Sequence, residues 1–146
     1  MENKTARGFL LPLIALVMLT LGSCTHNNGD IGPLFGNWKL VSVTGDTEGH
    51  EVPQGCSVDW NFQNSTIHMS MTLSGHRMDN RFGNYRLDDN TLFLDFPDTD
   101  TQYGEPLLGL PAQCELQVLR LDGRRLELLY VPTPESQGTT FTFRKF

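Results

Sequence analysis

Residues 56–73, CSVDWNFQNSTIHMSMTL, decide the fold of this chain. On both sides of Asn64-Ser65, apolar and polar side chains alternate, and this period of two is typical of strands with one buried face. Asn is among the residues that suit a tight turn, because it tolerates a positive φ. The stretch therefore predicts a β-hairpin made of strands Cys56–Gln63 and Thr66–Leu73.

The same alternation continues along most of the chain and no segment shows a helical stripe, so the sequence predicts an all-β protein. It predicts six further strands: Gly36–Thr44, Arg81–Leu87, Thr91–Phe96, Cys114–Leu121, Arg125–Val131 and Thr139–Lys145. One of them breaks the pattern, because Leu116 and Val118 share one face while Leu119 and Leu121 share the other. A β-bulge between Val118 and Leu119 would reconcile the two faces.

The connections between these strands alternate in length. Short turns are expected at Asn64-Ser65, Asp88–Asn90 and Asp122–Arg124, and longer loops at Gly45–Gly55, Ser74–Asn80, Pro97–Gln113 and Pro132–Gly138. An up-and-down arrangement places the short turns at one end and the long loops at the other. The sequence thus predicts an eight-stranded antiparallel up-and-down barrel with a closed end and a loop-rich mouth. Pairing the last strand with the first removes both exposed sheet edges.

The N-terminal segment has the features of a targeting signal. Arg7 precedes an apolar run, Gly8 to Leu21, that is short for a membrane span. Leu21-Gly22-Ser23-Cys24 resembles the lipobox of bacterial lipoproteins, which implies that residues 1–23 are a signal peptide and that Cys24 is acylated. Residues 24–35 would then form the acylated cysteine and a flexible tether, and residues 36–146 the barrel. The resemblance implies a lipid-anchored protein of the cell envelope, at the outer membrane. An ordinary signal peptide or a short transmembrane anchor is the alternative.

A second resemblance concerns the start of the first strand. Gly36-Asn37-Trp38 is similar to the Gly-x-Trp signature of the lipocalin and calycin families. The resemblance implies that Trp38 plugs the closed end and that a basic residue of the last strand, Arg144, covers its ring. Residues 36–146 as a whole resemble the short lipocalin-like lipoproteins common in Bacteroidetes, many of them domains of unknown function.

The barrel mouth is the expected binding site for a small apolar or amphipathic ligand. The predicted ligand-binding residues at the mouth and in the interior are Val58, Trp60, Met71, Leu73, Phe96, Leu108 and Tyr130. In the alternative interpretation these residues fill a solid core, and the protein is an interaction module that contacts a partner protein or a glycan through its mouth loops. Leu107, Leu108 and Leu110 predict either a lid over the mouth or, in the favoured version, a plug.

Cys56 and Cys114 both begin strands at the mouth. They predict either a disulfide that constrains the opening or two buried small apolar residues. Because their strands are four apart in a barrel of eight, the bond would require a flattened mouth or a folded-in loop.

Charge and motif content exclude several functions. A net charge of −6 with no basic cluster argues against a nucleic-acid partner. No catalytic or phosphate-loop motif occurs, so we expect no enzyme activity and no cofactor. His50, His68 and His76 are expected to be scattered on the surface, and Asp95, Asp98 and Asp100 fit a solvated acidic surface better than a calcium site, so no metal is expected. The lipid anchor is the only expected membrane contact, and no protein partner is identifiable.

Overall fold

The computed structural model describes residues 31–97 and 107–146. The predicted signal peptide, Cys24, most of the tether, Asp98 and Asp100 lie outside the described residues. Ile31–Phe146 forms one compact unit. Within the described ranges no helix is long and apolar enough to cross a membrane.

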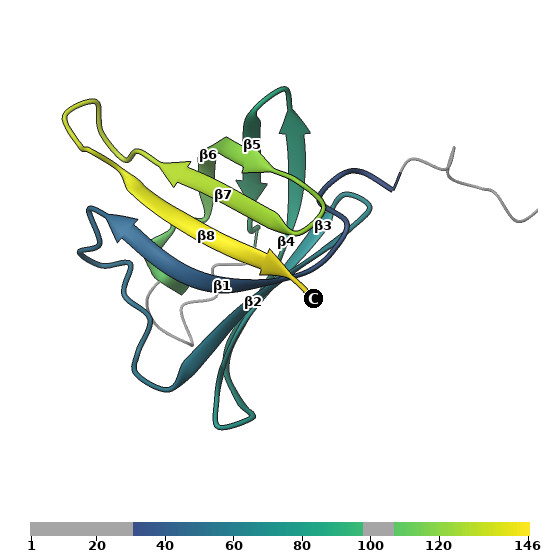
Figure 1. The fold of residues 1–146 in the computed structure, drawn as a ribbon, viewed down its shortest axis with the longest axis vertical. Helices are drawn as coiled ribbons and strands as arrows, with labels where there is room; N and C mark the ends of the chain where they lie inside the picture. The colour runs from purple at the N-terminus through teal and green to yellow at the C-terminus, as the bar shows by residue number, and fades with distance from the viewer. Residues whose placement is uncertain (1–30, 98–106) are drawn as a thin grey trace, which may run out of the picture. The chain divides into compact units, whose positions relative to one another are not determined.

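The barrel prediction is confirmed. Antiparallel strands pair in chain order from β1 to β8, and β8 returns to lie beside β1 (Figure 1). The strands are β1 Gly36–Gly45, β2 Cys56–Gln63, β3 Thr66–Leu73, β4 His76–Asp88, β5 Thr91–Asp95, β6 Gln113–Leu121, β7 Arg125–Tyr130 and β8 Thr139–Lys145. A short 3₁₀ turn, η3 (Leu107–Gly109), precedes β6.

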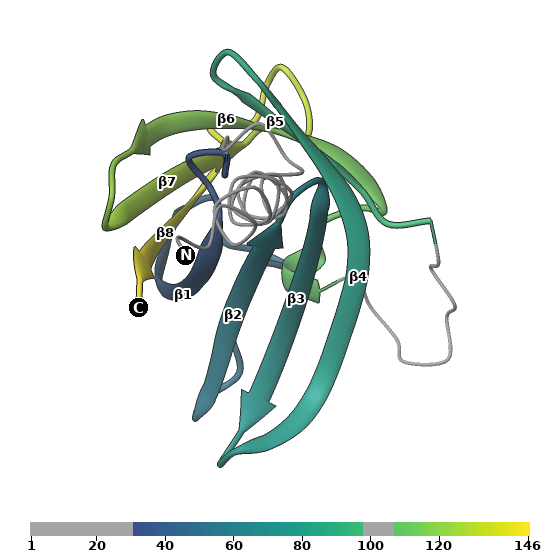
Figure 2. The ribbon, with the colours of Figure 1, turned by 90° about the vertical axis from the view of Figure 1, so that its right-hand side faces the viewer.

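One predicted loop is wrong. β4 begins at His76 instead of Arg81, so the expected loop Ser74–Asn80 is a two-residue turn between two long strands. Figure 2 shows β3 and β4 running side by side to this turn. Ser74 and Gly75 both have positive φ, 50° and 80°, as a tight hairpin requires. The polar run His76–Asn80 hid the strand because neither of its faces is consistently apolar.

Three register shifts interrupt the strand pairing of the barrel, one of them between β3 and β4 at Met71 and Thr72. The predicted bulge in β6 is confirmed by a register shift between Val118 and Arg120. A second shift lies in β1 between Leu40 and Ser42. β1 pairs with β2 only over Gly36–Lys39, whereas its pairing with β8 extends to Gly45. β1 and β2 therefore separate toward the mouth, and Figure 1 shows them diverging.

The closed end is built around Trp38, as the resemblance implied. Trp38 is fully buried and its Nε1 donates a hydrogen bond to the Leu34 carbonyl at 2.6 Å. The cation over its ring is Lys145, with Nζ 5.1 Å from the ring centroid, so the assignment of this role to Arg144 is corrected. Lys145 lies directly opposite Trp38 in the β1–β8 register and points to the same face as the buried Phe143. Arg144, one residue earlier, points to the outside because side chains alternate along a strand.

Candidate functional site

The mouth of the barrel is packed shut. Leu108 within η3 and Leu110 directly after it are buried, and the segment 46–55 contributes the buried side chain of His50. His50 Nδ1 donates to the Leu108 carbonyl, and the His50 ring meets Tyr130 edge-on at 5.7 Å between centroids. Leu108 and Leu110 thus form the plug that the sequence analysis favoured, and the prediction of a surface His50 is wrong.

Most of the predicted mouth residues belong to the core or pack against it. Val58, Trp60, Phe96 and Leu108 are buried in one continuous apolar cluster that begins at Trp38 and Leu34. Met71 and Tyr130 are half-buried and pack against this cluster, and Leu73 is half-buried at the end of β3. The structure therefore brings most of the predicted residues together, but as packing for the barrel interior.

A crevice opens in the barrel wall where β1 and β2 separate. It has a volume of about 390 Å³, which falls in the range of small-molecule sites. Segment 46–55 borders it on the mouth side. The lining residues are Leu40, Val41, Ser42, Val43, Thr47, Glu51, Val52, Cys56 and Val58.

The crevice wall is mainly aliphatic and continuous with the core. Leu40, Val43 and Val52 are half-buried and pack on the core, and the fully buried Val58 separates the crevice from the interior. Hydroxyl groups, one thiol and the exposed Glu51 carboxylate stand among them. Such a surface suits an apolar chain or ring with one polar end.

One buried donor lies next along the same strand. Trp60 follows Val58 on the inner face of β2 and is fully buried, yet its Nε1 has no hydrogen-bond partner among the described residues. A buried indole N–H without an acceptor costs about 1–3 kcal/mol. Trp60 does not itself line the crevice, because the buried Val58 lies between them.

The two cysteines are both free. Cys56 lines the crevice, whereas Cys114 lies across the barrel in β6 and packs against the core. Burial raises the pKa of the Cys114 thiol to about 12. The sequence left open either a disulfide between Cys56 and Cys114 or two buried small apolar residues. The structure shows two half-buried thiols and no disulfide between them.

The remaining polar candidates do not converge. The described residues contain no group of three or more His, Cys, Asp or Glu side chains that could hold a metal ion. His68 stacks on Phe82 at 4.2 Å between ring centroids, on the outer side of β3 and β4, and burial is the main cause that lowers its pKa. His76 begins β4.

Sequence reasoning missed the crevice because it treated β1 as one uninterrupted strand. Trp38 and Leu40 share a face by simple alternation, but Val43 has the opposite parity and still packs against the core. This change of parity is the signature of the bulge at Val41 and was legible in the sequence. Glu51 and Val52, in the segment that covers the mouth, carried no comparable signal.

Comparisons with known proteins support a lipocalin-like fold. A family model described as a lipocalin-like domain matches residues 17–146. A solved structure of a lipocalin-like protein from Bacteroides uniformis is 26% identical, with 79% of this chain and 100% of that chain covered and a TM-score of 0.53. An uncharacterized protein from Bacteroides eggerthii is 17% identical, with 77% and 99% covered and a TM-score of 0.55. Among curated proteins, none matches the chain.

Proposed function

The chain belongs to the lipocalin-like domain family, and from this premise we propose that it binds a small apolar or amphipathic molecule in the crevice between β1 and β2. The observation that carries the proposal is the aliphatic crevice of about 390 Å³, which is continuous with the core through Leu40, Val43 and Val52. The ligand is held without a covalent bond. The sequence led us to expect a ligand at the barrel mouth. Because η3 and segment 46–55 plug the mouth, we propose that the ligand enters through the side of the barrel wall.

The chemistry of the crevice narrows the ligand class. Burial of apolar ligand surface contributes about 25 cal/mol per Å². The hydroxyl groups of Ser42 and Thr47 in the crevice wall are suited to a carbonyl, ether or hydroxyl oxygen of the ligand. Glu51 at the rim disfavours an anionic group there, because a second negative charge nearby would be repelled. A neutral amphipathic molecule with one acceptor oxygen fits these features together.

Anchoring of the protein to a membrane is part of the same proposal. Acylation of Cys24 holds the barrel at a membrane of the cell envelope, at the outer membrane, through the tether that leads to Ile31. The ligand would then be sequestered at a membrane surface instead of diffusing with its carrier.

The binding site is tested with a neutral fluorescent probe, N-phenyl-1-naphthylamine, and the chain of residues 24–146 carrying Cys24→Ser. Val52→Trp fills the crevice and is expected to weaken probe binding at least about tenfold, because the apolar contact area is occupied. Val131→Trp makes the same exchange at an exposed mouth position outside the crevice and leaves binding unchanged. Equal probe affinity in the parent and Val52→Trp would contradict the proposed site, provided that both unfold at the same denaturant concentration.

The packed interior favours a second function, an interaction module that contacts a protein or a glycan through its mouth loops. Native mass spectrometry of the protein from its own host envelope separates the two. A small adduct that leaves on activation supports ligand binding. A bare protein mass, together with probe binding that is insensitive to Val52→Trp, favours the module.

A further inference from the structure

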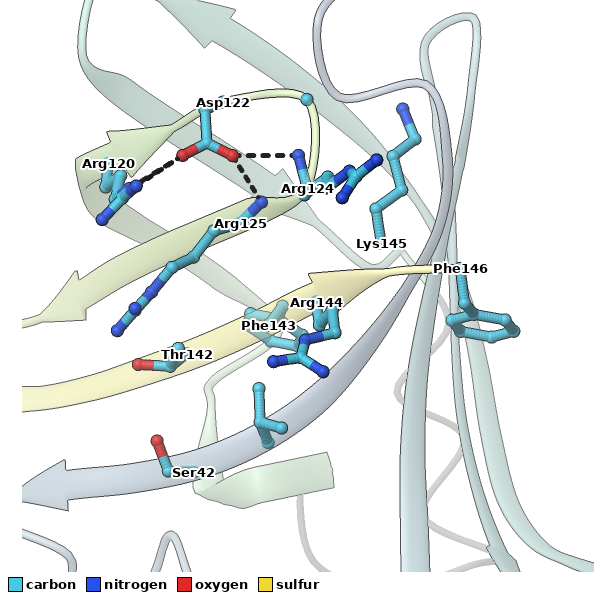
Figure 3. Close-up of a pocket in the computed structure, with 12 residues that line it drawn as sticks. Ser42, Arg120, Asp122, Arg124, Arg125, Thr142, Phe143, Arg144, Lys145 and Phe146 are labelled. Atoms are coloured by element: carbon cyan, nitrogen blue, oxygen red, sulfur yellow. Dashed lines mark hydrogen bonds and ion pairs between the residues drawn. The ribbon is translucent and has the colours of Figure 1, made fainter.

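The outer surface of the closed end carries a second hollow of a different character. Figure 3 shows this groove, which has a volume of about 1120 Å³ and lies over β1, β8 and the turn between β6 and β7. Five of the chain's eleven Lys and Arg residues line it: Arg120, Arg124, Arg125, Arg144 and Lys145. A protein with a net charge of −6 thus gathers nearly half of its cations in one place.

The single acidic side chain that lines the groove is largely occupied by the turn. Asp122 Oδ1 accepts hydrogen bonds from the backbone N–H groups of Arg124 and Arg125 at 2.9 and 2.8 Å. Asp122 Oδ2 pairs with the Arg120 guanidinium at 2.8 Å. These contacts, the backbone bond from Arg124 first, hold the pKa of Asp122 below its usual range.

Two guanidinium groups are left without a carboxylate. Arg125 pairs with Glu127 at 2.7 Å, but the side chains of Arg124 and Arg144 form no ion pair within residues 31–97 and 107–146. Figure 3 shows both side chains with no dashed contact. Arg124 and Arg144 are also exposed, so their charges face solvent and are available to an anion.

The strand register adds repulsion at the same place. Arg144 lies directly opposite Arg125 of β7 and opposite Lys39 of β1, which is itself opposite Asp59 of β2. Like charges directly opposite each other destabilise a sheet. An anion placed over Arg144 would relieve this repulsion, and guanidinium groups bind phosphate oxygens in a bidentate manner.

Exposed apolar groups accompany the cations. Phe146 is 71% exposed and lines the groove together with the exposed Val41. Ile31 and Phe35 are exposed where the described chain begins, and Gly36 lies against Lys145. Arginines mixed with exposed aromatic side chains match a lipid headgroup layer, in which phosphates lie beside apolar chains.

The position of the predicted anchor agrees with such a partner. Cys24 precedes Ile31 by seven residues, which extended chain spans in at most about 25 Å. Because the chain enters the barrel at the closed end, an anchor at Cys24 brings this end, and not the mouth, near the membrane.

We propose that the basic groove is a membrane contact, in which Arg124 and Arg144 bind phosphate groups of an anionic phospholipid surface and Phe146 lies at headgroup depth. The closed end then faces the bilayer, and the crevice between β1 and β2, which meets the groove at Val41 and Ser42, extends from there toward the mouth. This contact goes beyond the proposed ligand binding and does not require the acyl group.

The test uses residues 24–146 with Cys24→Ser, which retain the whole closed barrel and its core and carry no acyl chain. Sedimentation with phosphatidylcholine vesicles is compared with sedimentation with vesicles that also contain phosphatidylglycerol. Binding is expected to the anionic vesicles alone and to weaken with added salt. Arg124→Gln/Arg144→Gln, which removes two charges, is expected to weaken binding by about 30-fold, and Arg124→Glu/Arg144→Glu, which reverses them, is expected to weaken it further.

Arg77→Glu/Arg86→Glu is the matched control, because it changes the net charge equally on β4, across the barrel from β8. The control is expected to bind as the parent does. Equal loss in the control, binding that survives in both groove variants, or no binding by the parent would each overturn the proposal. If added inorganic phosphate abolishes vesicle binding at constant ionic strength, the groove would be assigned to a soluble phosphate instead.

Tryptophan fluorescence measures which end of the barrel contacts the vesicle surface. The emission of Phe146→Trp is expected to shift to the blue on anionic vesicles, whereas that of Val131→Trp at the mouth is not. The reverse result would place the mouth on the membrane and overturn the assigned orientation.

Discussion

Two half-buried thiols at the mouth end of the barrel differ in their surroundings. Cys114 packs against the core, and burial raises its pKa to about 12, so it stays protonated under physiological conditions. Cys56 lines the crevice beside Val58. A thiol reagent is therefore a reporter of the crevice through Cys56, while Cys114 is protected by burial.

The buried Cys114 thiol makes the stability of the barrel fall at alkaline pH. Its pKa is higher in the folded chain, about 12, than its ordinary value of 9.0, so the unfolded state loses its proton first. Its contribution to stability is complete below about pH 9 and is lost as the pH rises toward 12. From pH 8 to pH 11, the free energy of unfolding of the parent is expected to fall relative to Cys114→Ala by about 2 kcal/mol. Urea unfolding at both pH values measures this, and parallel pH profiles would refute it.

At the scale of elements, η3 is held in an unusual conformation by its partners. Leu108 has a φ of 59°, in the left-handed region that leucine rarely adopts. Its buried side chain and the hydrogen bond from His50 to its carbonyl offset this cost. Next to it, Gly109 approaches the backbone of Gly49 so closely that a Cβ would lie 2.1 Å from the Gly49 oxygen. The plug therefore depends on the absence of a side chain at one position.

Gly109→Ala and Gly49→Ala separate close packing from backbone conformation. Both glycines have positive φ, 65° and 78°, but a Cβ at Gly49 meets nothing within 4 Å. Gly49→Ala is expected to cost about 1 kcal/mol of stability from backbone strain alone. Gly109→Ala is expected to cost more than about 3 kcal/mol, because η3 must also move away from segment 46–55. Denaturant unfolding compares the two, and equal destabilisation would mean that η3 does not pack as described.

The whole molecule places two different surfaces on one packed barrel. The crevice lies in the mouth half of the wall, where β1 has left β2, and the basic groove lies over β1 and β8 at the closed end. The two surfaces share Val41 and Ser42 of β1 as lining residues, and the core behind them is continuous, so neither surface needs a hollow interior. Anchoring at Cys24 would give both surfaces a defined direction relative to the membrane.

The anchor is tested on the full chain in its host by incorporation of a labelled palmitate analogue. The parent and Cys56→Ala are expected to carry the label, and Cys24→Ala to carry none, because the proposed lipobox at residues 21–24 would direct acylation to Cys24 alone. Cys56→Ala is the control, because it also removes one thiol from the chain but leaves Cys24 in place. Label that persists in Cys24→Ala, or is absent from the parent, would contradict the lipoprotein assignment.

The architecture was predictable because its signals are local. Alternation of side chains, a tight turn such as Asn64-Ser65 and the parity change after Val118 are all encoded within a few neighbouring residues, and the barrel confirms them. The strand that began too late in the prediction, β4, lacks such a signal, because its first five residues have no consistently apolar face. Backbone pairing with β3 holds them in the sheet regardless of side-chain pattern.

The surfaces depend instead on register and pairing between distant strands. The sequence by itself determined an acidic chain, an eight-stranded barrel and Trp38 at its closed end. Only the tertiary structure decided that Lys145 covers Trp38, that β1 leaves β2 to open a crevice, and that Arg124 and Arg144 meet in one groove. No basic cluster is visible along the chain, because its members lie on different strands and turns. Cross-strand register, which long-range hydrogen bonding and the bulges in β1 and β6 fix, makes them neighbours.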